Sequence, residues 1–251
     1  MKVQDITIKH HGRNISGKVY LPEKDKYPIV VFSHGFNGAG DDFRIPAESL
    51  AKNGIAALTY DFCGGALNSK SDMQTHEMTV FTEKEDLTSV LSTVEAWENI
   101  DSNNIFLFGA SMGCLVSTLV AEEHAHEIKG MILLFPALCV ADNWNERFPS
   151  VDAIPQQYDV WGVPLGKSFF ETLHGFDIFE NIGKYSGNVL IMHGDKDDIV
   201  PVEYSERARE IYQNSRLEIF HGEGHGFSVA GNDKVIQMLI EFIISVGSSI
   251  C

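Results

Sequence analysis

The sequence predicts an α/β fold, in which a largely parallel β-sheet is covered by helices on both faces. Short apolar runs rich in β-branched and aromatic residues recur along the chain, and segments with helical periodicity separate them. Strands that are apolar on both sides are typical of parallel sheets buried between helices. With 251 residues, 44% of them apolar, the chain can bury one sizeable core. We therefore expect a single domain spanning residues 1–251.

Eight segments are predicted to be strands. Residues 3–9 and 14–21 alternate between polar and apolar side chains, and the His11-Gly12-Arg13 turn between them predicts an antiparallel hairpin. The remaining six are short apolar runs expected to form the buried, parallel part of the sheet. They are residues 29–33, 55–60, 105–108, 130–135, 189–193 and 217–220.

Two amphipathic helices are predicted between and after these strands. One carries an apolar stripe with helical spacing, and Thr82-Glu83-Lys84-Glu85 has the spacing of a capping box at its start. The other closes the chain and is expected to pack on the sheet. The stripes are Leu87, Val90, Leu91 and Val94 in the first helix, and Val235, Met238, Leu239, Phe242, Ile243 and Val246 in the second.

The stretch from about residue 137 to 187 departs from this alternation. It contains several aromatic and proline residues but no strand-like periodicity. Long insertions in compact domains are usually lids or binding elements. We predict that it forms a small cap over a binding site, with an apolar pocket beneath it.

Composition limits the partners and the compartment. A formal net charge of -16 repels phosphate backbones and anionic lipid, so we expect neither a nucleic acid nor a membrane partner, whereas a homodimer is left open. The chain shows no signal peptide or membrane-spanning run, and a cytoplasmic location is expected. Its four cysteines lack paired spacing and are predicted to be free thiols: Cys63, Cys114, Cys139 and Cys251.

A candidate nucleophile lies in Gly109-Ala110-Ser111-Met112-Gly113, between a predicted strand and a helical pattern. A serine held on a sharp strand-to-helix turn needs small neighbours, because the backbone is strained and the helix approaches the strand closely. The start of the helix also favours a negative charge that develops nearby. Ser111 is therefore the predicted nucleophile, although a glycine-flanked turn can occur without catalysis.

A serine hydroxyl requires a base that removes its proton, and His225 is the candidate. It lies in the glycine-rich segment Gly222-Glu223-Gly224-His225-Gly226, after the last predicted strand and before the last helix. A structural role for this histidine is the alternative.

The acid that orients this histidine is expected between the serine and the histidine in chain order. Three carboxylates follow the strand at 189–193, and they cannot all face one imidazole. We favour Asp197 and keep Asp195 and Asp198 as alternatives. The remaining carboxylates are expected to cap the helix that begins near Val202 or to lie in solvent.

Two backbone N–H groups are predicted to form an oxyanion hole. One belongs to Met112, directly after the nucleophile, and the other to Phe36 in the glycine-containing segment Ser33-His34-Gly35-Phe36-Asn37. His34-Gly35 can equally be a tight strand exit, and both interpretations can hold together.

These motifs, in this order and over the whole chain, resemble the α/β-hydrolase superfamily, and within it the cinnamoyl and feruloyl esterases of gut bacteria. The resemblance is carried by the His34-Gly35-Phe36 loop, Tyr60-Asp61-Phe62 and the segment His193 to Pro201. It implies an α/β-hydrolase fold with a cap that holds an aromatic acyl group. We predict that His34, Asp142, Trp161 and Phe169 contact substrate, and the alternative for Trp161 and Phe169 is that they pack the cap. Asp142 falls near a family acidic residue, whereas Phe169 stands where relatives tend to have tyrosine.

The prediction that follows is a serine carboxylesterase that needs no metal or organic cofactor and acts on small esters, of which hydroxycinnamoyl esters are the expected class. A lipase of the monoacylglycerol type or a serine peptidase of the same fold is the first alternative. The second is a binding protein that keeps the fold without catalysis.

Overall fold

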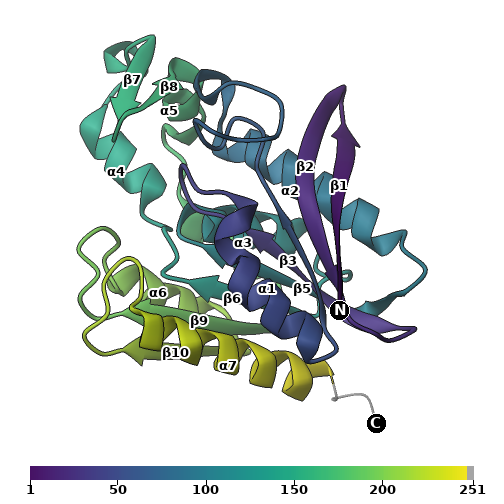
Figure 1. Ribbon diagram of the computed structural model, residues 1–251. Helices are drawn as coiled ribbons and strands as arrows, with labels where there is room; N and C mark the ends of the chain where they lie inside the picture. Colours follow the sequence, from purple (N-terminus) through teal and green to yellow (C-terminus); the bar gives the residue numbers. More distant parts are fainter. Residues whose placement is uncertain (248–251) are drawn as a thin grey trace.

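The computed structural model describes residues 1–247, and these contain an eight-stranded sheet of order β1-β2-β4-β3-β5-β6-β9-β10 (Figure 1). β1 pairs antiparallel with β2, and β2 pairs antiparallel with β4, whereas the other strand pairs are parallel. The strands are β1 (Lys2–His10), β2 (Arg13–Leu21), β3 (Tyr27–Ser33), β4 (Ala56–Tyr60), β5 (Ile100–Ala110), β6 (Gly130–Leu134), β9 (Asn188–Gly194) and β10 (Ser215–Phe220). The predicted α/β class and mostly parallel eight-stranded sheet are confirmed.

Helices cover both faces of this sheet because successive strand side chains point to opposite faces. Val30 and Phe32 of β3 belong to the core beneath α1 (Arg44–Lys52) and α7 (Val229–Gly247). Ile29 and Val31 belong to the core on the other face. That second core is covered by α2 (Val80–Glu95), α3 (Met112–Glu123) and α6 (Glu203–Ile211). Within residues 1–247, no helix has both the length and the apolar character needed to cross a bilayer.

The predicted capping box at the start of α2 is wrong. The helix begins three residues earlier, with Thr79 as its N-cap. The Thr79 side chain accepts a hydrogen bond from the Thr82 N–H at 3.0 Å, and the Thr82 hydroxyl oxygen accepts one from the Thr79 N–H at 2.9 Å. Thr82 is thus the third helical residue of the box and not its first member, and this position satisfies two backbone donors at the helix end.

The segment between β6 and β9, residues 135–187, lies at one end of the large sheet and is called the β6–β9 insertion (Figure 1). It contains an antiparallel strand pair that the sequence did not predict. The turn of this pair uses Trp161 and Gly162, both with positive φ, as a two-residue hairpin requires. Its elements are α4 (Val140–Arg147), η3 (Val151–Ala153), β7 (Gln157–Val160), β8 (Val163–Gly166), α5 (Lys167–Leu173) and η4 (Ile178–Glu180).

The cysteines of the described chain are free, as predicted. Cys63, Cys114 and Cys139 are buried. Cys251 lies outside the described residues. Burial raises the pKa of the Cys139 thiol to about 11 and that of the Cys63 thiol to about 12, so both are neutral near pH 7.

Two carboxyl groups on α2 are buried on the face that packs against the sheet. Glu83 is fully buried, and within the described chain neither of its carboxyl oxygens has a hydrogen-bond partner. Asp86 accepts a hydrogen bond from the Cys63 N–H at 2.7 Å. Burial, reinforced by the neighbouring Asp86, raises the pKa of Glu83 well above its ordinary value, so the native state holds this carboxyl in its neutral form.

The Glu83→Gln variant is therefore expected to become more stable than the wild-type protein as the pH rises. Below the ordinary glutamate pKa the carboxyl is protonated in both the folded and the unfolded chain, and the two proteins should melt together. Above that value the unfolded chain ionises at Glu83 while the folded chain keeps the proton, so wild-type stability carries a loss with rising pH that the variant lacks. Melting curves at pH 4 and pH 8 should show equal Tm values at the lower pH and a gain of roughly 2–4 °C at the higher. An equal difference at both pH values would contradict a neutral Glu83.

Candidate active site

Ser111 lies on a sharp turn between β5 and α3. Its backbone has a φ of 52° and a ψ of -120°, a left-handed conformation that is costly for any residue with a side chain. Three hydrogen bonds fix this conformation: the Ser111 N–H donates to the Leu134 carbonyl at 3.0 Å, and the Ser111 carbonyl accepts from the Ala137 and Cys114 N–H groups at 3.1 and 3.0 Å. The turn therefore holds the hydroxyl in one place.

The two glycines of this turn are required by close backbone contacts. A Cβ at Gly109 would lie 2.6 Å from backbone atoms of Cys114, and one at Gly113 would lie 2.3 Å from the Ser33 carbonyl oxygen. Gly35 likewise lets the segment after β3 approach Ser111, since a Cβ there would lie 3.0 Å from the Ser111 Cβ. Glycines at these positions bring α3 and the His34–Asn37 segment against the serine.

His225 and Asp197 meet Ser111 at the carboxyl edge of the parallel strands. The Ser111 hydroxyl donates to His225 Nε2 at 2.9 Å, and His225 Nδ1–H donates to Asp197 Oδ2 at 2.8 Å. Phe135 packs on the imidazole with ring centroids 4.7 Å apart. The imidazole side chain is 14% exposed and the carboxylate 1%. Three residues that are far apart in the sequence are thus joined by two successive hydrogen bonds.

Asp197 is held as a carboxylate despite its burial. Burial opposes its ionisation, but hydrogen bonds from the Val200 N–H, from His225 and from the Ile199 N–H outweigh that effect and lower its pKa. The two backbone bonds reach Oδ1 at 2.8 and 2.9 Å. The carboxylate can therefore fix the His225 tautomer that leaves Nε2 free to accept a proton.

The other two candidate carboxylates do not hydrogen-bond to His225. Asp195 accepts hydrogen bonds from exposed His221 at 2.8 Å and from the Gly222 N–H at 2.7 Å. Asp198 is exposed to solvent. Asp197 is therefore the carboxylate that hydrogen-bonds to the His225 imidazole.

Backbone N–H groups of Phe36 and Met112 lie beside the serine. Both residues line the same pocket as Ser111, and within residues 1–247 neither N–H donates to a protein atom. Met112 is the first residue of α3, where the helix dipole is positive. Two free donors next to the hydroxyl are suited to an oxygen that becomes negatively charged.

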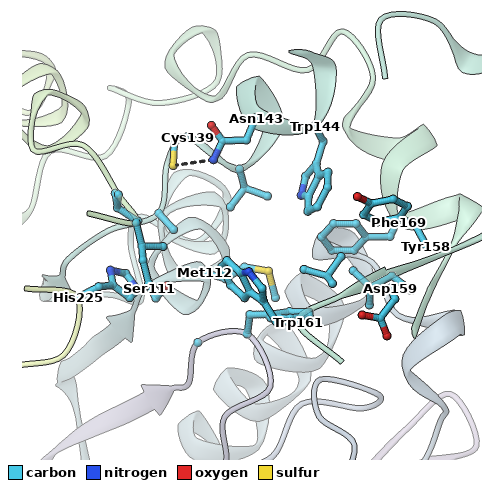
Figure 2. A pocket seen from close by; sticks show the side chains of 18 residues that line it. Ser111, Met112, Cys139, Asn143, Trp144, Tyr158, Asp159, Trp161, Phe169 and His225 are labelled. Carbon is cyan, nitrogen blue, oxygen red and sulfur yellow. Dashed lines mark hydrogen bonds between the residues drawn. The ribbon is translucent and has the colours of Figure 1, made fainter. Parts of the chain in front are cut away.

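A pocket of about 450 Å³ opens from this point and runs beneath the β6–β9 insertion. Ser111 and His225 lie at one side of it, and the aromatic rings of the insertion lie at the other (Figure 2). Trp161 and Phe169 line it, as the resemblance implied, although Trp161 is 75% exposed at the hairpin tip. Tyr158 and Trp144 add two more rings. Among the residues that line this pocket in the described chain, none is lysine or arginine, and Asp159 is the one carboxylate.

The structure corrects the substrate-binding assignment of His34. This imidazole is 1% exposed and does not line the pocket. Its Nδ1–H donates to the Gly35 carbonyl at 2.7 Å, and its Nε2 accepts from the Phe62 N–H at 3.0 Å. Both ring nitrogens are used by backbone groups, so His34 braces the segment that carries Phe36 and has no atom left for a ligand.

Asp142 is corrected in the same way. Its carboxylate accepts a hydrogen bond from the Tyr204 hydroxyl at 2.7 Å and is absent from the pocket lining. Successive helical residues are turned by about 100°, so the face of α4 that presents Val140, Asn143 and Trp144 to the pocket points Asp142 elsewhere. Asp142 ties α4 to α6.

Sequence reasoning missed two features of the site. Asn143 and Asp159 supply polar groups to the pocket wall, and no pattern in an aperiodic segment distinguishes them. His193, at the end of β9, was not among the predicted site residues, yet its Nε2 lies 3.1 Å from Asp197 Oδ2. The spacing of four residues between them was the available signal.

Comparisons with known proteins show which sequences this chain resembles. A family model described as serine aminopeptidase, S33 matches residues 24–161. A proline iminopeptidase of Thermoplasma volcanium is 24% identical, over 96% of this chain and 97% of that protein. A non-heme haloperoxidase of Rhodococcus erythropolis is 38% identical over 80 residues, which cover 32% of this chain and 28% of that protein.

Solved structures share the fold over nearly the full length. Est1E from Butyrivibrio proteoclasticus, solved with ferulic acid bound, has a TM-score of 0.89 and 24% identity, with 97% of this chain and 100% of that chain covered. The same protein in another structure gives a TM-score of 0.84.

Proposed function

This chain belongs to the family described as serine aminopeptidase, S33, which has the α/β-hydrolase fold. From that premise we propose that it is a serine carboxylesterase that acts on esters of aromatic acids, with hydroxycinnamates as the first candidates. One observation carries the proposal. The Ser111 hydroxyl donates to His225 at 2.9 Å at the side of a pocket whose far wall carries several aromatic rings.

The reaction is a two-step acyl transfer. His225 removes the Ser111 proton as Ser111 Oγ attacks the ester carbonyl, and the carbonyl oxygen, now negative, accepts hydrogen bonds from the Phe36 and Met112 N–H groups. The imidazolium then gives its proton to the departing alcohol. Water, deprotonated by the same imidazole, attacks the acyl-enzyme, and Ser111 recovers its proton as the acid leaves. Asp197 keeps the imidazole in one tautomer during both steps.

The pocket favours a flat, uncharged acyl group. Trp144 and Phe169 meet edge to face with ring centroids 6.4 Å apart, and an aromatic ring can be held by the same kind of contact. The lining offers no cation to an anionic substrate, and Asp159 would repel one. We therefore assign the acyl group to the insertion side of the pocket, where residues 137–187 act as a cap.

An aminopeptidase-like activity is the second candidate, and the family description favours it. The same triad hydrolyses amides, and the Asp159 carboxylate could pair with a substrate ammonium group. A monoacylglycerol lipase is the third candidate, because aliphatic side chains such as Val140, Val160 and Leu165 also line the pocket and would suit an acyl chain.

A substrate panel separates these activities. We expect kcat/KM for methyl ferulate and methyl cinnamate to exceed that for a monoacylglycerol and for prolyl anilide by about tenfold or more, the difference of roughly 1.4 kcal/mol that one aromatic contact can supply. A higher kcat/KM for the anilide would replace the esterase proposal by the aminopeptidase one. Labelling by a fluorophosphonate, read by mass at Ser111, tests the nucleophile without a choice of substrate.

The Phe169→Leu variant tests the acyl pocket. Loss of the ring edge is expected to raise KM for methyl ferulate by about 5- to 10-fold while kcat and the KM for methyl butyrate change little, since the short chain does not reach the rings. Phe170→Leu is the matched control, because Phe170 is equally buried but does not line the pocket. Equal increases of KM for both esters in the Phe169 variant would place the acyl group elsewhere.

A further inference from the structure

We infer that His193 and Ser205 are positioning residues, which hold the Asp197 carboxylate in the orientation that serves His225. The inference rests on the proposed function only for its kinetic consequences, because the contacts that carry it are present whatever the substrate. None of the three sequence motifs of the triad includes Ser205, which lies in α6.

The Asp197 carboxylate accepts four hydrogen bonds. Oδ1 accepts those from the two backbone N–H groups described above, and Oδ2 accepts His225 Nδ1–H at 2.8 Å and His193 Nε2–H at 3.1 Å. Both side chains of the His193–Asp197 pair are shielded from water, with 0% and 1% exposure. A carboxylate with donors on both oxygens cannot rotate without breaking a buried bond, which is expensive.

The proton on His193 is placed by its other contacts. His193 Nε2 also lies 3.1 Å from the Val200 carbonyl oxygen, which can only accept, so Nε2 carries the proton. Nδ1 is then unprotonated and accepts the Ser205 hydroxyl at 2.6 Å. The Val200 carbonyl and the Asp197 carboxylate therefore select the tautomer in which His193 donates to Asp197, and the Ser205 hydroxyl holds the ring in that orientation.

Two other titratable groups surround this pair. His225 comes from the segment before α7, and Cys139 from the start of α4 has a neutral thiol because burial raises its pKa to about 11. Burial lowers the pKa of His193 and outweighs the opposite effect of Asp197 and of the Val200 carbonyl. The His193 imidazole is therefore neutral. The Asp197 carboxylate is thus the anion that both histidines face, and each histidine donates one hydrogen bond to it.

The order Ser205, His193, Asp197, His225, Ser111 makes one chain of hydrogen bonds that ends on the nucleophile. Removing the Ser205 hydroxyl leaves the buried His193 Nδ1 without a donor, so the ring is no longer held on that side and its Nε2–H bond to Asp197 weakens. Asp197 then directs more of its charge to His225 and favours the imidazolium form.

The test compares Ser205→Ala with Ser117→Ala. Ser117 is also fully buried in a helix, but its hydroxyl has no hydrogen-bond partner within the described chain. Titration of His225, followed by NMR of the ¹⁵N-labelled full-length protein, is expected to move to higher pH by roughly half a unit in Ser205→Ala and to stay unchanged in Ser117→Ala. The acid limb of the kcat/KM profile should move with it, and kcat/KM should fall about 10-fold.

His193→Gln provides the rescue, since its amide N–H can take the place of the Nε2–H donor. We expect its His225 titration to lie closer to wild type than that of His193→Ala, with folding of each variant checked by its melting curve. An unmoved His225 titration in Ser205→Ala would overturn the inference, as would an equal movement in Ser117→Ala. Because the NMR readout needs no turnover, the expected movement in Ser205→Ala together with a wild-type protein that hydrolyses no ester would refute the esterase proposal alone.

Discussion

The Ser111→Ala variant is expected to lose ester hydrolysis by about 10⁵-fold or more in kcat, the size of loss seen when a serine nucleophile is removed from such a triad. The reason is chemical, because within residues 1–247 the Ser111 hydroxyl is the one that hydrogen-bonds to His225 Nε2. Folding should be unaffected. The backbone hydrogen bonds that fix the turn belong to N–H and carbonyl groups that alanine keeps.

The measurement is the initial rate with methyl ferulate, together with fluorophosphonate labelling of both proteins. His225→Ala should lose nearly as much, and the double variant should be no slower than Ser111→Ala, since the two residues act as one unit. Ser117→Ala, six residues further along α3, should retain the wild-type rate. Hydrolysis by Ser111→Ala above roughly 1% of wild type would show that another group attacks the carbonyl, far outside the range expected for this mechanism.

The sheet could be predicted from the sequence because burial on both faces leaves a direct signature. Each parallel strand is a short apolar run. Because side chains alternate between the two faces of a strand, Val30 and Phe32 pack in one core and Ile29 and Val31 in the other. The nucleophile turn was also readable, because strain and close contact at Gly109 and Gly113 admit so few residue types.

Side-chain direction in the insertion could not be predicted. Asp142 was placed in the pocket because of its position in the chain, yet the phase of α4 turns it to Tyr204. The strand pair β7–β8 was missed because Pro164 and the turn residues interrupt the alternating pattern in strands of only four residues each. Such elements depend on packing against the rest of the protein, which a local pattern does not contain.

His193 illustrates a different limit. A buried histidine at the end of a strand has no pattern of its own, and its meaning comes from Asp197, from the Val200 carbonyl and from a serine one helix further on. Asp197 could therefore be predicted from the sequence, whereas the contact of His193 with it could not.

The choice among the three carboxylates leads to the second large effect. Asp197→Asn is expected to lower kcat/KM by about 10³- to 10⁴-fold, while Asp198→Asn stays within about twofold of wild type. In the variant, the amide oxygen keeps the Ile199 and Val200 N–H bonds, so the amide nitrogen faces both His225 and His193. A nitrogen donor opposite His225 Nδ1 drives its proton to Nε2, where it can no longer accept the proton of Ser111.

Asp198→Asn is the matched control, because it removes one negative charge from the same loop at an exposed position. Asp195→Asn removes a carboxylate that accepts from His221 and the Gly222 N–H, a surface contact that affects stability little and the imidazole not at all. All three variants change the net charge equally, so a general electrostatic effect would lower their kcat/KM values together. A loss confined to Asp197→Asn, with labelling of Ser111 slowed in the same proportion, would locate the effect in the tautomer of His225.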